Sequence, residues 1–344
     1  MITEAAVLFN INEPLRVIEL EIPRLKKGQV LVEILYSGAC GTQLGEISGK
    51  RGEDKFLPHC LGHEGVGKVI DVGPEVKKFS VDDKVVLSWI KGSGIDAGGT
   101  VYKSNNLNIN SGPVTTFQRH SVVSENRLTI LPDNISNEYA VMLGCSAPTG
   151  MGSVKNILIP NANTSAIVFG AGAVGLSACL SFKKHGVKKI IVVDPIQERL
   201  DLALYAGATD IIKSIDHDMI INAVSKIEPR GLDYAVESVG KPNIIPLCVE
   251  LLKRQGGKLV VIGNSPSGET FELKPDVFNL GKSIMGSWGG NSNPDTDFDD
   301  YSKLLIDSKT FLQKLISKTY SLEKINDALS DLSKGIVGRP LIRM

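Results

Sequence analysis

The sequence has no excess of charge of either sign and contains few cysteines. Among its 344 residues, 38 lysines and arginines balance 38 aspartates and glutamates, so no overall field points to nucleic acid or to a membrane surface as a partner. Its five cysteines follow no regular spacing. They argue against a disulfide framework and favour a reducing compartment.

Long hydrophobic runs are also missing. The longest apolar stretch, residues 166–180, is too short for a membrane helix and contains three glycines. The first residues lack the basic segment and apolar core of a secretory signal, so we expect a cytoplasmic protein. A chain of this length, with 42% apolar residues, is sufficient for two domains that each bury a core.

Two hydrophobic patterns divide the chain. In the first 150 residues, short apolar or alternating runs at 30–35, 65–72 and 84–87 are bounded by turn residues, which predicts a compact, mostly antiparallel β domain. Residues 91–112 are rich in Gly, Ser and Asn and predict a long loop.

From about residue 153, predicted strands alternate with predicted helices, which is typical of a parallel, doubly wound sheet. The expected strands are 166–169, 189–193, 234–236, 258–262 and 283–285, with helices at 195–206 and 217–227 among them. Two amphipathic helices (297–308 and 322–334) and a last strand ending at Met344 follow. We therefore expect the second domain to be inserted into the first.

The segment Ser165–Gly175 (SAIVFGAGAVG) predicts a dinucleotide site. Gly170 would allow a tight turn, Gly172 a close approach of the backbone to a pyrophosphate, and Gly175 close packing of helix on strand. The N-terminus of the following helix would offer free N–H groups to the phosphates. Asp194 closes the next apolar run, at the distance typical of a carboxylate that binds ribose hydroxyls.

Three separate segments carry possible zinc ligands. They are Gly38-Ala-Cys40-Gly-Thr42, Gly62-His63-Glu64-Gly65 and Leu143-Gly-Cys145-Ser. Two thiolates and one imidazole form a three-ligand set that leaves a fourth position open for water or substrate, as in catalytic zinc sites. Spacing alone does not show that the three meet in the fold.

The order of these motifs resembles the zinc-dependent medium-chain dehydrogenase/reductases, most of all the alcohol and polyol dehydrogenase branches. The matching pieces run along the whole chain: Cys-Gly-Thr, Gly-His-Glu, Gly-Cys-Ser-x-Pro-Thr-Gly, the glycine turn, Val-Val-Asp-Pro and a final Gly-Arg-Pro. The resemblance implies an α/β chain with a GroES-like, β-rich catalytic domain (1–146 and 289–344). It also implies a Rossmann nucleotide domain (147–288).

The resemblance implies a catalytic zinc on Cys40, His63 and Cys145. Glu64 would be a carboxylate that transiently binds the metal, or alternatively a supporting group or buried ion-pair partner. Thr42 would hydrogen-bond the substrate oxygen and begin a proton relay; the alternative is a helix N-cap.

The resemblance also assigns cofactor contacts. Thr149 would hydrogen-bond the nicotinamide, and Val174 would pack on it or else belong to the core. Arg339 would bind the pyrophosphate or be a solvated charge. Arg199 would assist Asp194 at the ribose. Because Asp194 would repel a 2′-phosphate, NAD is favoured over NADP.

Substrate specificity is suggested only by the residues expected around the pocket. Trp89 and Phe117 fall at lining positions, although both could be core residues. Glu46, Lys50 and Arg51 would place polar groups at the mouth. A hydroxylated substrate such as a polyol, sugar or aminocyclitol is therefore expected.

The sequence departs from the family pattern at three places. Gln43 stands where an Asp would orient the zinc-binding imidazole. Gly45 stands where some relatives carry a relay histidine, so the proton would leave through Glu46, the ribose hydroxyls or water. Residues 90–112 contain none of the four cysteines that bind a structural zinc in many members, so we expect one catalytic zinc and no structural zinc.

The remaining histidines and cysteines are not assigned to the active site. They are expected to be structural (His59), surface (His120, His185, His217), without a partner in view (Cys60) or core (Cys179, Cys248). The predicted protein is an NAD-dependent zinc alcohol or polyol dehydrogenase, a homodimer or homotetramer joined near residues 283–287. Two alternatives are a zinc-free quinone-reductase-like enzyme and a zinc enzyme that reduces and reoxidises its NAD without net redox change. A third, a non-enzymatic binding protein with the same fold, is disfavoured by the intact set of zinc ligands.

Overall fold

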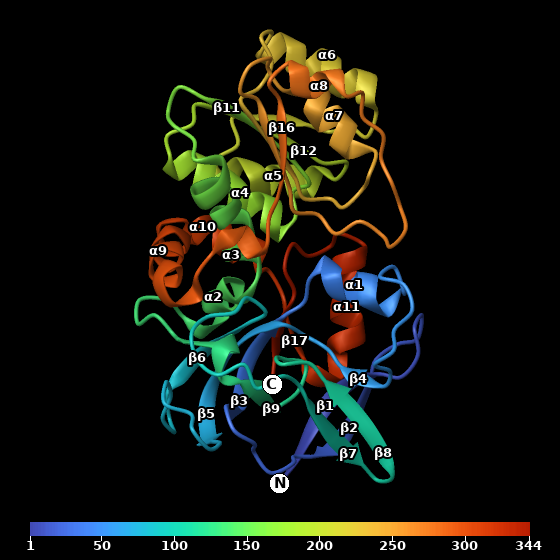
Figure 1. Ribbon diagram of the computed structural model, residues 1–344, viewed down its shortest axis with the longest axis vertical. Coiled ribbons are helices and arrows are strands. Elements are labelled where there is room, and N and C mark those ends of the chain that lie inside the picture. The colour runs from blue at the N-terminus through green and yellow to red at the C-terminus, as the bar shows by residue number, and fades with distance from the viewer. The chain divides into compact units, whose positions relative to one another are not determined.

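The computed structural model describes all 344 residues and divides into two compact units (Figure 1). The first unit comprises Met1–Cys145, Asn293–Ile306 and Ile316–Met344, and the second comprises Ser146–Ser292 and Asp307–Leu315. The divisions expected at 146 and 289 lie within a few residues of these cuts. No helix has both the length and the apolar composition needed to cross a bilayer.

The first unit consists of β-structure with short helices. Its strands are β1 (Ile2–Leu8), β2 (Arg16–Glu21), β3 (Gln29–Gly38), β4 (His59–Cys60), β5 (Glu64–Val72), β6 (Lys84–Ser88), β7 (Thr100–Ser104), β8 (Leu107–Ser111), β9 (His120–Ser124), β10 (Leu128–Ile130), β17 (Thr319–Ser321) and β18 (Leu341–Arg343). Its helices are α1 (Gly41–Ile47), α2 (Asn137–Ala140), α9 (Pro294–Asp307) and α11 (Ile325–Ser333), and a 3₁₀ segment, η2 (Val141–Gly144), follows α2.

These strands form a closed barrel and a larger sheet. The barrel order is β1-β2-β7-β8-β4, and the sheet order is β10-β6-β5-β3-β18-β17, with β9 also paired to β3. Side chains alternate between the two faces of β3, so this strand contributes to two of the core clusters. Val30, Val32 and Ile34 pack into one cluster, and Leu31 packs into another with Val122. The mostly antiparallel, GroES-like β domain expected from the sequence is thus confirmed.

The prediction of a long loop at residues 91–112 is wrong for its second half. Residues 100–111 form the hairpin β7–β8, in which Ser104 pairs with Leu107 across the two-residue turn Asn105–Asn106. Asn105 has a φ of 53°, a left-handed conformation that Asn tolerates well. Tyr102 is buried between two exposed residues, and Ile109 is buried between an exposed and a half-buried residue. The alternation was present, but the many Asn and Ser residues concealed it.

The second unit contains a parallel sheet flanked by helices. Its strands are β11 (Ser165–Phe169), β12 (Lys189–Val193), β13 (Asp210–Ile212), β14 (Tyr234–Glu237), β15 (Lys258–Val261) and β16 (Ser283–Gly286). Its helices are α3 (Ser146–Gly152), α4 (Ala173–Lys184), α5 (Gln197–Ala206), α6 (His217–Ile227), α7 (Ile244–Leu251), α8 (Asp276–Asn279) and α10 (Lys309–Leu315).

The strand order β13-β12-β11-β14-β15-β16, parallel throughout, confirms the Rossmann arrangement. Ile167 and Phe169 face a cluster that includes Ile220 of α6 and Cys248 of α7. Helices α4 and α5 contact each other, as do α6 and α7, and Figure 1 shows the two pairs on opposite faces of the sheet. The direction of chain progression reverses between β11 and β14, where such folds bind nucleotides.

Helix α10 belongs to the second unit, although residues 307–315 were assigned to the first domain. Phe311, Leu312 and Leu315 are buried, and α10 contacts α5. Lys314 Nζ lies 4.7 Å from the ring centroid of Tyr205 on α5. The apolar face of this short helix therefore completes the packing of the nucleotide unit. Domain bounds drawn as continuous ranges of the sequence did not predict this packing.

Candidate metal and cofactor sites

The three predicted zinc ligands meet in the first unit. Cys40 is the N-cap of α1, His63 immediately precedes β5, and Cys145 follows η2. Their ligand atoms all lie within 4.8 Å of one another, with Cys40 Sγ 3.4 Å from His63 Nε2. Tetrahedral zinc, with bonds of about 2.3 Å to sulfur and 2.0–2.1 Å to nitrogen, would separate these two atoms by roughly 3.5 Å. The three residues fit the ion.

Glycines make room for the residues behind the cluster. A Cβ at Gly38 would lie 2.0 Å from Glu64 Oε1, and one at Gly144 would lie 2.6 Å from Glu64 Cβ. Gly62 has a φ of 89°, which is the left-handed region that favours glycine. Crowding around Glu64 therefore explains Gly38 and Gly144, and the left-handed turn explains Gly62.

The surroundings of Cys40 favour the thiolate, which is the form that binds a metal. A hydrogen bond with Cys145 is the largest cause that lowers its pKa, well below the usual value, against the effect of burial; His63 and Arg339 act in the same direction. By contrast, burial raises the pKa of both Cys60 and Cys179 to about 12. Only the thiolate is a metal ligand. Cys60 and Cys179 are thus inert core thiols.

Gln43 supports His63 from behind. Its side chain is fully buried, its Oε1 accepts the backbone N–H of Cys40 at 2.9 Å, and its Nε2 lies 2.6 Å from His63 Nδ1. Since Cys40 is the N-cap of α1, this amide connects the helix start to the imidazole. Sequence reasoning noted the departure at position 43 but did not predict this bridge.

Glu64 lies in a buried ion pair with Arg339. The two side chains are 1% and 3% exposed, and Arg339 Nη2 contacts Glu64 Oε1. Burial lowers the pKa of Arg339, opposed by the charge of Cys40. The alternative of a solvated Arg339 is therefore wrong. Of the alternatives for Glu64, the structure shows the ion-pair partner, and its carboxylate is not part of the three-ligand cluster.

The remaining predicted residues of the first unit have different surroundings. Thr42 lies inside α1, and its alternative as the N-cap is wrong because Cys40 has that position. Trp89 is partly buried against the β3 core, and Phe117 is fully buried in a different core cluster. Phe117 is thus a core residue.

Polar groups near the cluster are paired with one another. Arg51 Nη1 lies 3.3 Å from Glu46 Oε1, and Lys50 is exposed. Burial raises the pKa of Glu46, opposed mainly by Arg51. His59 Nε2 lies 2.8 Å from Asp54 Oδ2, a structural pairing as expected. His120, His185 and His217, which were expected to be surface residues, are partly exposed.

The glycine turn of the second unit has the geometry that its sequence implies. Gly170 has a φ of 94°, and a Cβ at Gly175 would lie 2.0 Å from the Gly170 carbonyl oxygen. A Cβ at Gly172, the N-cap of α4, would meet no atom within 4 Å. Open space at the helix N-terminus, beside tight helix–strand packing, suits a bound pyrophosphate.

Asp194 connects the end of β12 to this turn. The carboxylate is 4% exposed and accepts the backbone N–H groups of Ala171 and Ile196, each at 2.9 Å. A carboxylate has about four acceptor positions, so two remain for ribose hydroxyls. Arg199 follows on α5 and is half-buried.

The predicted nicotinamide contacts lie where α3 meets α4. A Cβ at Gly150 would be 2.1 Å from the Val174 carbonyl oxygen, so the two helices touch beside Thr149 and Val174. Thr149 Oγ1 is buried and makes no hydrogen bond within the protein. An unpartnered buried hydroxyl is costly, and an amide on a ligand would satisfy it.

The loop without cysteines is held by a carboxylate that sequence reasoning missed. Glu125 is 2% exposed. It accepts the backbone N–H groups of Lys77 and Lys78 at 2.9 Å and of Ile95 at 2.7 Å. Asp295 of α9 accepts Ser93 N–H at 2.6 Å. The available signal was an acidic residue in the segment Val123–Arg127, which was treated only as a family motif.

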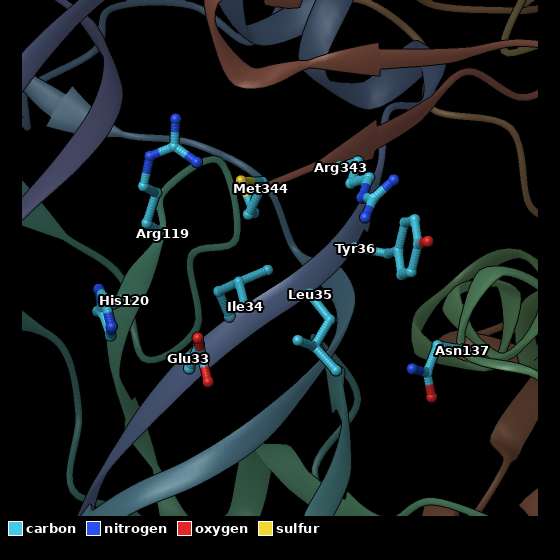
Figure 2. Close-up of a pocket in the computed structure, with 9 residues that line it drawn as sticks. All are labelled: Glu33, Ile34, Leu35, Tyr36, Arg119, His120, Asn137, Arg343 and Met344. Atoms are coloured by element: carbon cyan, nitrogen blue, oxygen red, sulfur yellow. The ribbon is translucent and has the colours of Figure 1, made fainter.

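A hollow of about 370 Å³ on the first unit is separate from this site (Figure 2). Its lining includes Glu33, Tyr36, His120 and Arg343 and none of the predicted site residues. Glu33 and His120 are register partners on β3 and β9. The hollow therefore has no part in the chemistry argued below.

Comparison with known proteins finds the same two-part organisation. Residues 26–133 match the alcohol dehydrogenase GroES-like domain, and residues 173–307 match the zinc-binding dehydrogenase domain. The chain is 30% identical to S-(hydroxymethyl)glutathione dehydrogenase of Escherichia coli, over the full length of both.

Two solved structures share the fold closely. One is an alcohol dehydrogenase zinc-binding domain protein from Burkholderia ambifaria, with a TM-score of 0.90 at 30% identity. The other is benzyl alcohol dehydrogenase from Acinetobacter calcoaceticus, with a TM-score of 0.89 at 30% identity. Each alignment covers 100% of this chain and 99% of the other.

Proposed function

The chain belongs to the family of zinc-dependent medium-chain dehydrogenases, and from this premise we propose that it transfers a hydride between an alcohol and NAD at a single catalytic zinc. One observation carries the proposal. Cys40, His63 and Cys145, which are far apart in the chain, bring two sulfurs and a nitrogen within 4.8 Å of one another. This is the donor set of a catalytic zinc with one position open.

Zinc held by Cys40, His63 and Cys145 would supply a Lewis acid for the substrate oxygen. The protein's own residues manage the proton. Thr42, two residues after Cys40, is proposed to hydrogen-bond that oxygen. Glu46 lies one turn further along α1, and burial raises its pKa, which makes its carboxylate a better proton acceptor. Because Gly45 has no side chain, Glu46, the ribose hydroxyls or water would take the proton onward.

NAD supplies the hydride acceptor, and the second unit is proposed to bind it. Gly170, Gly172 and Gly175 shape the pyrophosphate turn, and Asp194 with Arg199 binds the adenosine ribose. The negative charge of Asp194 favours NAD over NADP.

The remaining cofactor contacts are carried by three residues. Thr149 Oγ1 is proposed to hydrogen-bond the nicotinamide amide, and Val174 to pack on its ring. Arg339 is proposed to approach the pyrophosphate; the Glu64 carboxylate neutralises it until the anion arrives. Glu64 as a transient zinc ligand remains a prediction, because its carboxylate would first have to leave Arg339.

For the substrate, we propose a hydroxylated alcohol such as a polyol, sugar or aminocyclitol. The partly buried Glu46 and its partner Arg51 offer hydrogen-bonding groups near the cluster, and Trp89 offers an apolar wall. The relatives named for benzyl alcohol and S-(hydroxymethyl)glutathione define the competing substrates. NADH formation from polyols, amino sugars, benzyl alcohol and S-(hydroxymethyl)glutathione, measured side by side, decides among them.

Replacing one ligand tests the function. Cys145→Ala should abolish turnover and lower the zinc content while leaving NADH binding, followed by fluorescence, largely intact. Cys60→Ala is the matched control, because Cys60 is a buried thiol of the same unit outside the cluster. Undiminished turnover in Cys145→Ala would refute the zinc mechanism. Substrate conversion with co-purified NAD and no net NADH would instead identify an enzyme that reoxidises its cofactor in place.

We also propose a homodimer or homotetramer. Strand β16 ends the six-stranded sheet and pairs only with β15. Its unpaired edge is a template for strand pairing with a second copy.

A further inference from the structure

When His63 binds zinc, two N–H groups face the two ends of the Gln43 amide, but only one end carries an acceptor atom. The His63 atom that faces the thiols is Nε2, 3.4 Å from Cys40 Sγ, whereas Nδ1 faces Gln43 Nε2 at 2.6 Å. Zinc bound at Nε2 takes the lone pair of that nitrogen. A neutral imidazole must then carry its proton on Nδ1, where it becomes a hydrogen-bond donor.

The side chain of Gln43 faces two donors in that state. One is the backbone N–H of Cys40, which Gln43 Oε1 accepts at 2.9 Å, and the other is the Nδ1–H of His63. An amide has one carbonyl oxygen and one NH₂ group. Whichever way the amide of Gln43 is turned, its NH₂ group meets one of these two donors, inside a site where Gln43 is fully buried.

Without metal the conflict disappears. The NH₂ group of Gln43 donates to the bare Nδ1 of His63, and the proton of the ring resides on Nε2. There it points at Cys40 Sγ, and the two are 3.4 Å apart. All three contacts of the bridge are then between a donor and an acceptor.

We propose that Gln43 is a positioning residue that holds metal-free His63 in the Nε2–H tautomer and thereby lowers the affinity of this site for zinc. This inference rests on the proposed zinc function. To bind the ion, the ring proton must move from Nε2 to Nδ1 and face an amide that also donates. A carboxylate of the same length would accept both N–H groups.

The size of the effect follows from what such supporting groups contribute. Mutating the partner that orients a zinc-binding histidine changes metal affinity about 10- to 100-fold. Gln43→Glu should therefore bind zinc about 10- to 100-fold more tightly than the natural protein.

The test is zinc affinity, measured by competition with a chromophoric chelator on the reduced, full-length protein. Gly45→Glu is the charge control: a Cβ there meets no atom within 4 Å, and it adds the same charge to α1 without reaching His63 Nδ1. The inference requires the gain in Gln43→Glu to exceed that in Gly45→Glu by about tenfold. Equal gains in the two variants would overturn it.

A neutral variant and a spectroscopic reading keep the inference testable if the carboxylate disturbs the fold. Gln43→Leu, which removes the opposing donor together with the acceptor, should bind zinc at least as tightly as the natural protein; a loss of about tenfold would show that Gln43 helps zinc to bind. In the zinc-free natural protein, ¹⁵N shifts of His63, assigned by their loss in His63→Asn, should report the Nε2–H tautomer. The Nδ1–H tautomer would contradict the inference.

Failure of the inference is distinct from failure of the proposed function. If the natural protein binds zinc in a manner that depends on Cys145 but Gln43→Glu changes nothing, only the role of Gln43 is refuted. If neither protein binds zinc at Cys145, the zinc function itself is refuted.

Discussion

The carboxylate of Glu125 offers a sharp test of what holds the cysteine-free loop. Many relatives fix this region with a structural zinc, as the family resemblance implies. Here Glu125 Oε1 accepts two backbone N–H groups from residues 77–78, and Oε2 accepts Ile95 N–H at 2.7 Å. One side chain therefore ties two segments together.

Glu125→Gln should weaken this tie by a calculable amount. The amide keeps one acceptor oxygen, and its NH₂ group opposes at least one backbone N–H. Losing a hydrogen bond to a charged group costs about 1.5–3 kcal/mol, so we expect a loss of about 2–3 kcal/mol in the local opening free energy. That corresponds to roughly 30- to 150-fold faster hydrogen exchange at Ile95.

The pH dependence of this effect has a defined sign. Burial raises the pKa of Glu125, but the backbone N–H groups of Ile95, Lys78 and Lys77 outweigh it, so the pKa lies below its usual 4.5. A carboxyl whose pKa is depressed on folding contributes fully above the unfolded value and loses that contribution as the pH falls through the folded value. The difference between Glu125→Gln and the natural protein should thus be constant down to about pH 4.5 and shrink below it.

The control is Asp96→Asn in the same loop. Asp96 pairs with Lys91, but its side chain is 47% exposed, and exposed pairs contribute only about 0.2–1 kcal/mol. If Glu125→Gln and Asp96→Asn alter exchange at Ile95 equally, the loop is not held by Glu125 and the argument fails.

Two further substitutions test the glycine turn and the buried ion pair of Glu64 and Arg339. Gly175→Ala would place a Cβ 2.0 Å from the Gly170 carbonyl oxygen, so we expect NADH to bind about tenfold more weakly or worse, a loss of about 1.4 kcal/mol; unchanged fluorescence titration would disprove a cofactor site at this turn. Arg339→Met leaves the buried charge of Glu64 unpaired and should cost about 3–5 kcal/mol in urea denaturation. Adding Glu64→Gln should recover part of that loss, and no recovery would show that the pair is not coupled.

The sequence predicted well those parts of the fold in which the hydrophobic pattern is not interrupted by turn-forming residues. Strands β11, β12 and β14 contain continuous apolar runs, typical of a parallel sheet buried on both faces, and the alternation of these runs with helices predicted the parallel sheet. The hairpin β7–β8 was missed because its exposed positions carry Asn and Ser, which are also turn residues. Helix α10 was missed because seven residues with three buried side chains give too short a pattern to separate from α9.

The site could be predicted in composition but not in contacts. The motif order identified Cys40, His63 and Cys145, and the structure brings them together. The partner of Glu64 could not be found from spacing, because Arg339 lies 275 positions later in the numbering and reaches it only through β18 pairing with β3. The sequence left Phe117 open as a lining or a core residue, and the structure shows it fully buried in a core cluster.

The departures at Gln43 and Glu125 have a common physical basis, which is the number of acceptors that a buried side chain offers to N–H groups. At Glu125, three backbone donors meet a carboxylate and all are satisfied, so the loop can be ordered by hydrogen bonds alone. At Gln43, an amide meets two donors once zinc is bound and can satisfy one. Exchanging a carboxylate and its amide at both positions should therefore act in opposite directions: Glu125→Gln loosens a structure that needs the charge, whereas Gln43→Glu strengthens a metal site that lacks it.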